Sequence, residues 1–201
     1  MNYLLPPLFI LLAVTTYSSL HSILASLRVK AWARRTFGEG AVTRYYRLFF
    51  NLVGTLTLLP VLWLAGALPD RQLYTIPFPW VLLTAAGQLY GAWILLSSVL
   101  HTGTADFLGL QQALARPDSE PSKLKTDGFY ARMRHPLYTG SMLVLWLLPV
   151  LSANALALVI SFSLYFWVGA IFEERKLERY FGNDYKNYKA RTLMFVPLLK
   201  R

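Results

Sequence analysis

The densest group of chemically capable residues lies where a basic segment meets an apolar one. There the sequence reads Arg134-His135-Pro136-Leu137-Tyr138-Thr139-Gly140. Proline suits the first turn of a helix because its missing N–H is not needed there, so we expect a helix to begin at Pro136. The free N–H groups and the positive dipole end of that helix would then lie beside Arg134 and His135. Such a place suits a carboxylate ligand, and the structural alternative is an interfacial anchor.

Two adjacent carboxylates, Glu173 and Glu174, follow the last apolar segment of the chain. Carboxylates at a membrane boundary are costly unless they are paired or hydrogen-bonded. If the two apolar segments that precede them form a helical hairpin, Glu173 and Glu174 return to the membrane face on which Arg134 and His135 lie. We therefore expect these four side chains to be neighbours.

The three histidines of the chain, His21, His101 and His135, all lie near the ends of apolar segments. An imidazole there can simply hydrogen-bond a carbonyl group or a lipid headgroup, which is the structural alternative to a chemical role. We expect no metal site, because the sequence has no His-x-x-x-His or Glu-x-x-His pair. The absence of cysteine excludes a thiol nucleophile and a zinc–thiolate site.

The segments that must position these residues are membrane helices. The chain of 201 residues is 55% apolar and only 15% charged, with a mean hydropathy of +0.40. Five stretches lack Asp, Glu, Lys and Arg: 3–27, 48–69, 73–100, 137–151 and 155–172. A membrane helix needs about 20 residues, so the first three suffice alone, whereas the last two are short and closely joined. We predict an all-α integral membrane protein with about five transmembrane helices and a C-terminal amphipathic helix. We expect Gly182 to end the helix that continues past Glu174.

Nearly all basic residues lie on one side of this arrangement. Six fall between the first and second stretches, five between the third and fourth, and eight after the fifth, which leaves only Arg71 on the other side. Lys and Arg are retained on the cytoplasmic side during insertion. We therefore predict an N-terminus outside and a C-terminus in the cytoplasm, with the bilayer as partner. The net charge of +10 is explained by topology, and without an aromatic–basic platform we expect no nucleic-acid partner.

We expect one integrated domain in two parts. Residues 1–100 form a three-helix membrane region, and residues 101–201 form the region that carries the candidate site. The connection 101–135 contains a cluster of turn-forming residues at 117–122. Connections of this length are usually functional or disordered.

The second half of the chain carries four short motifs in order: Leu124-x-Thr126-x-Gly128-x-Tyr130, Arg134-His135-Pro136-x-Tyr138-x-Gly140, Glu173-Glu174 and Phe181-Gly182-x-x-Tyr185-x-x-Tyr188. Together they resemble the C-terminal signature of integral-membrane methyltransferases related to isoprenylcysteine carboxyl methyltransferase and the phospholipid N-methyltransferases. The match covers 123–197, a little over a third of the chain. Segments 20–22, 46–51 and 107–110 look more like the bacterial branch that includes small-thiol methyltransferases.

This resemblance implies S-adenosylmethionine as the methyl donor, bound on the cytoplasmic side beneath the C-terminal segment and aimed at a tunnel open to the bilayer. It also implies a location in the inner membrane of a bacterium. The residues that it implies for cofactor binding are Leu124, Thr126, Gly128, Tyr130, Arg134, His135, Tyr138, Gly140, Glu173, Glu174, Tyr185 and Tyr188. The candidates for a catalytic role are Arg134, Glu174 and His101.

The acceptor is not fixed by these residues. An isoprenylcysteine-type carboxylate, a small thiol and a lipid headgroup all remain open, as does the oligomeric state. Methyl transfer from a sulfonium is an in-line displacement that depends on positioning and exclusion of water. A thiol acceptor would need a base, such as His101, His21 or a glutamate, whereas a carboxylate acceptor would need none. The alternatives are an NADPH-dependent membrane reductase of the sterol-reductase type, whose extra spans are absent, and a non-catalytic lipid-binding protein.

The predicted orientation can be tested by labelling introduced cysteines in intact cells. We expect a cysteine at Asp70 to react with an impermeant thiol reagent and one at Ser119 to be shielded, because the loop at Asp70 is predicted to face outward and the segment at Ser119 to face the cytoplasm. The cysteine-free background means that every signal comes from the introduced residue. The opposite pattern would invert the topology.

Overall fold

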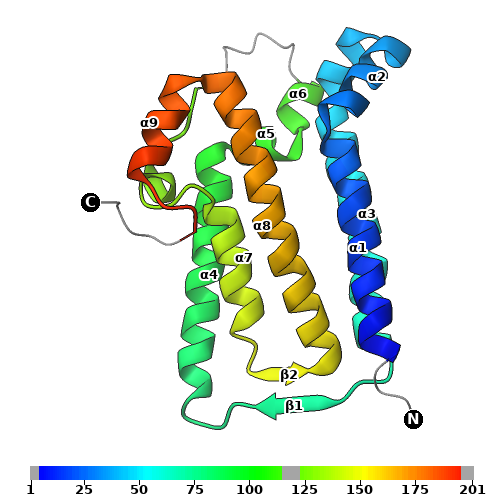
Figure 1. Cartoon of the computed structure of the whole chain (residues 1–201), viewed down its shortest axis with the longest axis vertical. Coiled ribbons are helices and arrows are strands. Elements are labelled where there is room, and N and C mark those ends of the chain that lie inside the picture. The colour runs from blue at the N-terminus through cyan, green and yellow to red at the C-terminus, as the bar shows by residue number, and fades with distance from the viewer. Residues whose placement is uncertain (1–4, 115–122, 196–201) are drawn as a thin grey trace. The chain divides into compact units, whose positions relative to one another are not determined.

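The fold is that of an all-α membrane protein. The computed structural model describes residues 5–114 and 123–195 (Figure 1). Within these ranges, four helices are long and apolar enough to cross a membrane: α1 (Leu5–Ala25), α3 (Glu39–Ala67), α4 (Val81–Thr102) and α8 (Ala153–Phe181). The predicted fold class is confirmed, and the predicted orientation stays a prediction. The turn-forming cluster at 117–122 lies outside the described residues.

The expected fourth membrane span is only partly a helix. Helix α7 (Pro136–Trp146) has 11 residues, and the chain then forms β2 (Val150–Ser152), which pairs with β1 (Gln72–Thr75). Pro149 explains the change, because a residue that precedes proline is disfavoured in helical conformation. The carbonyl of Pro149 instead accepts a hydrogen bond from the N–H of Ile76 at 2.8 Å. The described residues thus contain four helices of spanning length where about five were expected.

Helix α8 continues past the apolar span 155–172, so Glu173 and Glu174 lie within the helix, beyond its apolar part. The helix ends where Gly182, at φ +57°, donates its N–H to the carbonyl of Glu178 at 3.0 Å. A left-handed φ is accessible to glycine at little cost. The chain then turns into α9 (Asn183–Arg191), so the predicted end of the helix at Gly182 is confirmed.

The described chain divides into two compact units. The first contains α1, α2 (Leu27–Phe37), α3, α5 (Thr104–Leu108), α6 (Leu110–Leu114) and the start of α8. Helices α1 and α3 pack side by side, as Figure 1 shows. Polar side chains of α3 hold the short helices: Arg47 forms an ion pair with Asp106 at 2.8 Å, and Asn51 donates to the carbonyl of Phe107 at 2.9 Å. Part of the expected long connection is therefore helical.

The second unit contains β1, α4, the 3₁₀ helix η1 (Gly128–Ala131), α7, most of α8, and α9. Two glycines, Gly91 of α4 and Gly140 of α7, let the backbones of these helices approach closely. A Cβ on Gly91 would lie 2.9 Å from the carbonyl oxygen of Gly140. Small residues at such contacts are typical of helix packing in membranes. This tight pair fixes the position of α7, which carries the Arg-His-Pro motif at its start.

This contact predicts a sharp difference between two glycine-to-alanine variants. Gly91→Ala should destabilise the protein in detergent by about 1–3 kcal/mol, because the added methyl group overpacks the α4–α7 contact. Gly66→Ala is the matched control, since no atom lies within 4 Å of the place that its added methyl group would take. Thermal unfolding of both purified variants is the measurement. Equal midpoints for Gly91→Ala and Gly66→Ala would contradict the close approach.

Candidate active site

The start of α7 is covered by the C-terminal segment of the described chain. The N–H of Arg134 donates to the carbonyl of Leu193 at 2.9 Å, and the N–H of His135 donates to that of Met194 at 3.0 Å. The Thr139 hydroxyl donates to the carbonyl of Phe195 at 2.9 Å. Pro136 stands at the first turn of the helix, as predicted. The site is therefore built under residues 193–195.

The centre of the site is a buried ion pair. Arg134 Nε donates to Glu174 Oε1 at 2.6 Å, and the two residues are 8% and 3% exposed. The same guanidinium donates to the carbonyl of Thr192, while Lys189 Nζ lies 2.8 Å from Glu174 Oε2. Hydrogen bonds to Glu174 and Glu178 raise the pKa of Lys189, so it stays charged at neutral pH. Glu174 is thus fully engaged by cations of its own chain and ties α9 to α8.

His135 bridges the two carboxylates. Its Nε2 lies 3.3 Å from Glu174 Oε1, and its Nδ1 lies 3.5 Å from Glu173 Oε2. The Tyr138 hydroxyl donates to the same Glu173 oxygen at 3.0 Å, and its ring stacks on the imidazole with centroids 5.4 Å apart. The side chain of Glu173 is 48% exposed. Of the two carboxylates, Glu173 is therefore the one that a ligand can reach.

Helix α9 places two tyrosines against the site. The Tyr188 hydroxyl donates to the carbonyl of Tyr130 at 2.6 Å and so ties α9 to η1. Tyr185 is only 1% exposed, and among the described residues its hydroxyl has no hydrogen-bond partner. Burial raises the pKa of both hydroxyls, so they stay protonated. A buried hydroxyl without a partner is unusual in native proteins and marks Tyr185 as a candidate ligand contact.

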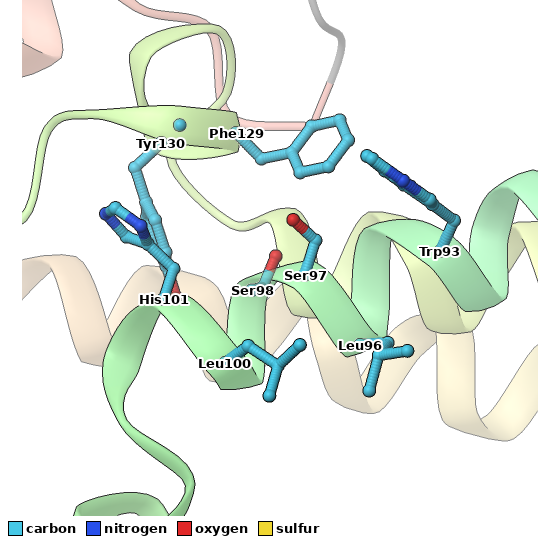
Figure 2. Close-up of a pocket in the computed structure, with 9 residues that line it drawn as sticks. Trp93, Leu96, Ser97, Ser98, Leu100, His101, Phe129 and Tyr130 are labelled. Carbon is cyan, nitrogen blue, oxygen red and sulfur yellow. The ribbon is translucent and has the colours of Figure 1, made fainter.

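A pocket lies beside the end of α4. It has a volume of ≈ 410 Å³ and is lined by Trp93, Leu96, Ser97, Ser98, Leu100, His101, Gly128, Phe129 and Tyr130 (Figure 2). His101 Nε2 lies 2.7 Å from Asp127 Oδ1. This hydrogen bond lowers the pKa of Asp127, which therefore stays ionised at neutral pH. An ionised carboxylate on one imidazole nitrogen leaves the other nitrogen able to accept a proton.

The structure brings most of the predicted site residues together, in two adjoining groups. One group contains Arg134, His135, Tyr138, Glu173, Glu174, Tyr185 and Tyr188, and the other contains His101, Gly128 and Tyr130. The neighbourhood expected for the Arg-His pair and the two glutamates is confirmed. What each residue does for a cofactor stays a prediction.

Four residues named in the sequence analysis stand apart from these groups. Gly140 faces α4, where a Cβ would lie 2.7 Å from the carbonyl oxygen of Gly91, so its described contact is with a helix. Leu124 is half-buried and Thr126 exposed in the extended stretch before η1. His21, a possible base, lies in the other unit, where a Cβ on Gly54 would be 3.1 Å from its ring.

Sequence reasoning missed Trp93, Ser97, Asp127 and Lys189. Trp93, Ser97 and His101 occur at spacings of four, which places them on one helix face, and this signal was available. Asp127 stands at a variable position between two motif residues, and Lys189 directly follows Tyr188. Nothing in the spacing alone indicates that either would pair with a site residue. Within the described ranges, no cluster of three metal-binding side chains is present.

The buried pair of Arg134 and Glu174 predicts that Glu174→Gln has a larger effect than the same substitution at Glu178, one helical turn away. Glu174→Gln leaves the buried Arg134 without a carboxylate, and breaking a buried pair in this way costs about 3–5 kcal/mol. We expect residues 183–195 to lose protection in hydrogen exchange measured at neutral pH. Because the pKa of Lys189 is raised, its contacts with Glu174 and Glu178 stabilise the protein fully at neutral pH. This stabilisation is lost only as the pH rises through the pKa of Lys189.

Glu178→Gln is the matched control. Glu178 also pairs with Lys189, at 2.7 Å, but its side chain is 32% exposed. A pair of this kind contributes at most about 1 kcal/mol. Equal protection of residues 183–195 in the two variants would contradict a structural role for the Arg134–Glu174 pair.

The chain is similar to several known proteins. The family model described as "Protein of unknown function (DUF1295)" matches residues 10–192. Methanethiol S-methyltransferase 1 of Bradyrhizobium diazoefficiens is 29% identical over 191 residues, which cover 93% of this chain and 65% of that protein. Methanethiol S-methyltransferase of Crocosphaera subtropica is 29% identical over 190 residues, 89% of this chain and 70% of the relative.

Nurim of Mus musculus is 30% identical over 158 residues, which cover 72% of this chain and 58% of Nurim. The chain therefore spans less than two thirds of the length of the Bradyrhizobium protein and of Nurim. No solved structure matches the chain. The resemblance to the integral-membrane methyltransferases is confirmed: the chain belongs to the DUF1295 family, which includes methanethiol S-methyltransferases and Nurim.

Proposed function

We propose that this protein is an S-adenosylmethionine-dependent membrane methyltransferase that methylates a small thiol. The observation that carries the proposal is the convergence of Arg134, His135, Glu173 and Glu174 at one site beneath α9. Residues from separate motifs meet there, and the residues that hold the site together differ from those that a ligand can reach. The names of the two methanethiol S-methyltransferases support the reaction class and the acceptor.

The residues present fit such a donor, which carries an ammonium group, a carboxylate, ribose hydroxyls and an adenine. Glu173 offers an exposed carboxylate that can accept from hydroxyls or from an ammonium group. Tyr185 offers a buried hydroxyl that, among the described residues, is not already bonded.

Arg134 and Glu174 have a different task in this proposal. Both were candidates for a catalytic role, but both are buried and satisfied by each other, by Lys189 and by a main-chain carbonyl group. Buried groups that already have several partners in their own chain have little capacity left for a ligand. We therefore assign them a positioning role: they hold His135 and α9 in place.

The chemistry that the donor supplies is a methyl group bonded to a positively charged sulfur. The protein then has to hold both reactants in line and exclude water, and no covalent intermediate with the enzyme is needed. Helix α9, held by Lys189 and Tyr188, covers the site. These contacts provide the fixed geometry on which such a reaction depends.

We further propose that the site faces the cytoplasm, in the cytoplasmic membrane of a bacterium, because of the one-sided distribution of basic residues. In this arrangement residues 1–100 and 101–201 act as one integrated domain, and the second part supplies the donor site.

The proposal is tested by calorimetric titration of the detergent-purified protein with S-adenosylmethionine, S-adenosylhomocysteine and NADPH. We expect the first two to bind and NADPH not to bind. Transfer of labelled methyl to a thiol, rather than to a prenylated carboxylate or to phosphatidylethanolamine, then identifies the acceptor class. Binding of NADPH alone would overturn the proposal in favour of a reductase.

Two tyrosine variants sharpen the same titration. Tyr185→Phe should weaken binding of S-adenosylmethionine roughly tenfold or less, the range of one hydrogen bond, without lowering the stability of the free protein. Tyr188→Phe is the control, because its hydroxyl bonds the carbonyl of Tyr130. It should lower stability even without ligand. Unchanged affinity in Tyr185→Phe would remove Tyr185 from the donor site.

A further inference from the structure

The pocket beside α4 has a composition suited to a small, partly apolar molecule. Trp93, Ser97 and His101 share one face of α4, and Phe129 and Tyr130 of η1 lie opposite them, as Figure 2 shows. The rings of Trp93 and Phe129 meet edge to face with centroids 5.4 Å apart. Aromatic rings make favourable contacts with sulfur. The pocket thus combines apolar walls with a single imidazole.

The imidazole of His101 is oriented by a carboxylate. With Asp127 Oδ1 at 2.7 Å from Nε2, the proton belongs on Nε2 and the free electron pair on Nδ1. Among the described residues, Nδ1 makes no hydrogen bond. Gly128 keeps this edge of the ring open: it has no side chain, and a Cβ there would stand 3.7 Å from Nδ1.

We propose that this pocket binds the thiol acceptor and that His101, positioned by Asp127, is the base that removes the thiol proton. This inference rests on the proposed function and adds to it the acceptor site and the base. His101 is a catalytic residue in this scheme because it touches the substrate, whereas Asp127 is a positioning residue because it acts through His101.

The step balances without any further reactant. The thiol proton passes to His101 Nδ1, and the sulfur electron pair forms the new carbon–sulfur bond to the methyl group of the sulfonium donor. The old bond from that methyl group to the donor sulfur breaks, its electron pair stays on the donor sulfur, and a neutral thioether leaves. The imidazolium then returns its proton to solvent, which it can reach because the His101 side chain is 33% exposed.

Tyr130 connects the pocket to the proposed donor site. The ring of Tyr130 is 6.5 Å from that of His101, and its carbonyl accepts the hydrogen bond from Tyr188. Burial raises the pKa of Tyr130, and the charge of Glu173 adds to the shift. Tyr130 therefore lines the proposed acceptor pocket and, through its carbonyl group, is hydrogen-bonded to α9 of the proposed donor site.

The other candidate bases are less suited. Glu173 already accepts from Tyr138 and contacts His135. Glu174 is buried in its ion pair with Arg134. His21 packs against Phe50, with ring centroids 4.4 Å apart, in the other unit. His101 is the histidine that lines the described pocket.

The test uses two thiols that differ in acidity: ethanethiol, which is protonated at neutral pH, and thiophenol, which is largely ionised. Initial rates of methylation by labelled S-adenosylmethionine are measured across pH with the full-length protein. For His101→Gln we expect kcat/KM with ethanethiol to fall by about 10²-fold or more, the usual contribution of a general base. For Asp127→Asn we expect a smaller fall than for His101→Gln, because Asp127 acts only by orienting the imidazole. With thiophenol, both variants should stay close to wild type, because no proton has to be removed.

The pH profile gives a second readout, since a merely structural defect would lower rates at every pH. In His101→Gln the rate with ethanethiol should follow ionisation of the thiol alone. The charged and titratable groups at His101 are Asp127, Tyr130 and Lys125, whose Nζ donates to the His101 carbonyl at 2.8 Å. Asp184→Asn is the control, because Asp184 is an exposed carboxylate in the first turn of α9, outside the pocket. It should leave both rates unchanged.

The outcomes separate the two proposals. Equal losses with both thiols, or no loss with either, would overturn the role of His101 as base. Loss of S-adenosylmethionine binding in His101→Gln, measured by calorimetry, would overturn the acceptor assignment, because the pocket would then be part of the donor site. Wild-type protein that binds the donor and methylates neither thiol would overturn the acceptor class. Wild-type protein that does not bind the donor would overturn the proposed function, and the proposed base with it.

Discussion

The ion pair between Arg134 and Glu174 is the constraint on which the site depends. Charges buried this deeply cannot be left alone without a large cost in free energy, so each must keep its partners. Those partners come from the segment just before α7, from α8, from α9 and from the segment beyond α9. The contacts of this one buried ion pair therefore hold four segments of the chain together. Glu173 is next to Glu174 in α8, so its position is fixed as well.

Glu173 and Glu174 are adjacent in α8 but have different environments. Successive positions on a helix point about 100° apart, so Glu174 turns inward to Arg134 while Glu173 remains half exposed beside Tyr138. The inward carboxylate gives rigidity, and the outward one keeps free acceptor capacity. A binding site needs both, since a ligand group held by a mobile side chain gains little in orientation.

The sequence predicted what depends on periodicity and charge: the apolar helices, the end of α8 at Gly182 and the meeting of Arg134 and His135 with the glutamates. It did not predict what depends on a single local contact. Pro149 redirects an apolar stretch into a strand, although hydropathy alone favours a helix there. The pairing of His101 with Asp127 joins residues 26 positions apart, and no sequence period connects them.

The connection between α7 and α8 bridges the difference in length between the two helices. Helix α7 rises about 16 Å over its 11 residues, whereas α8 climbs about 30 Å between Ala153 and Glu173. Extended backbone covers about 3.3 Å per residue, so the few residues from 147 to 152 make up the difference. One residue gained or lost in that turn would change the reach of the connection by about 3.3 Å, which is close to the 3.5 Å between His135 Nδ1 and Glu173 Oε2. The length of the connection 147–152 must therefore match the positions of His135 and Glu173 at the other ends of α7 and α8.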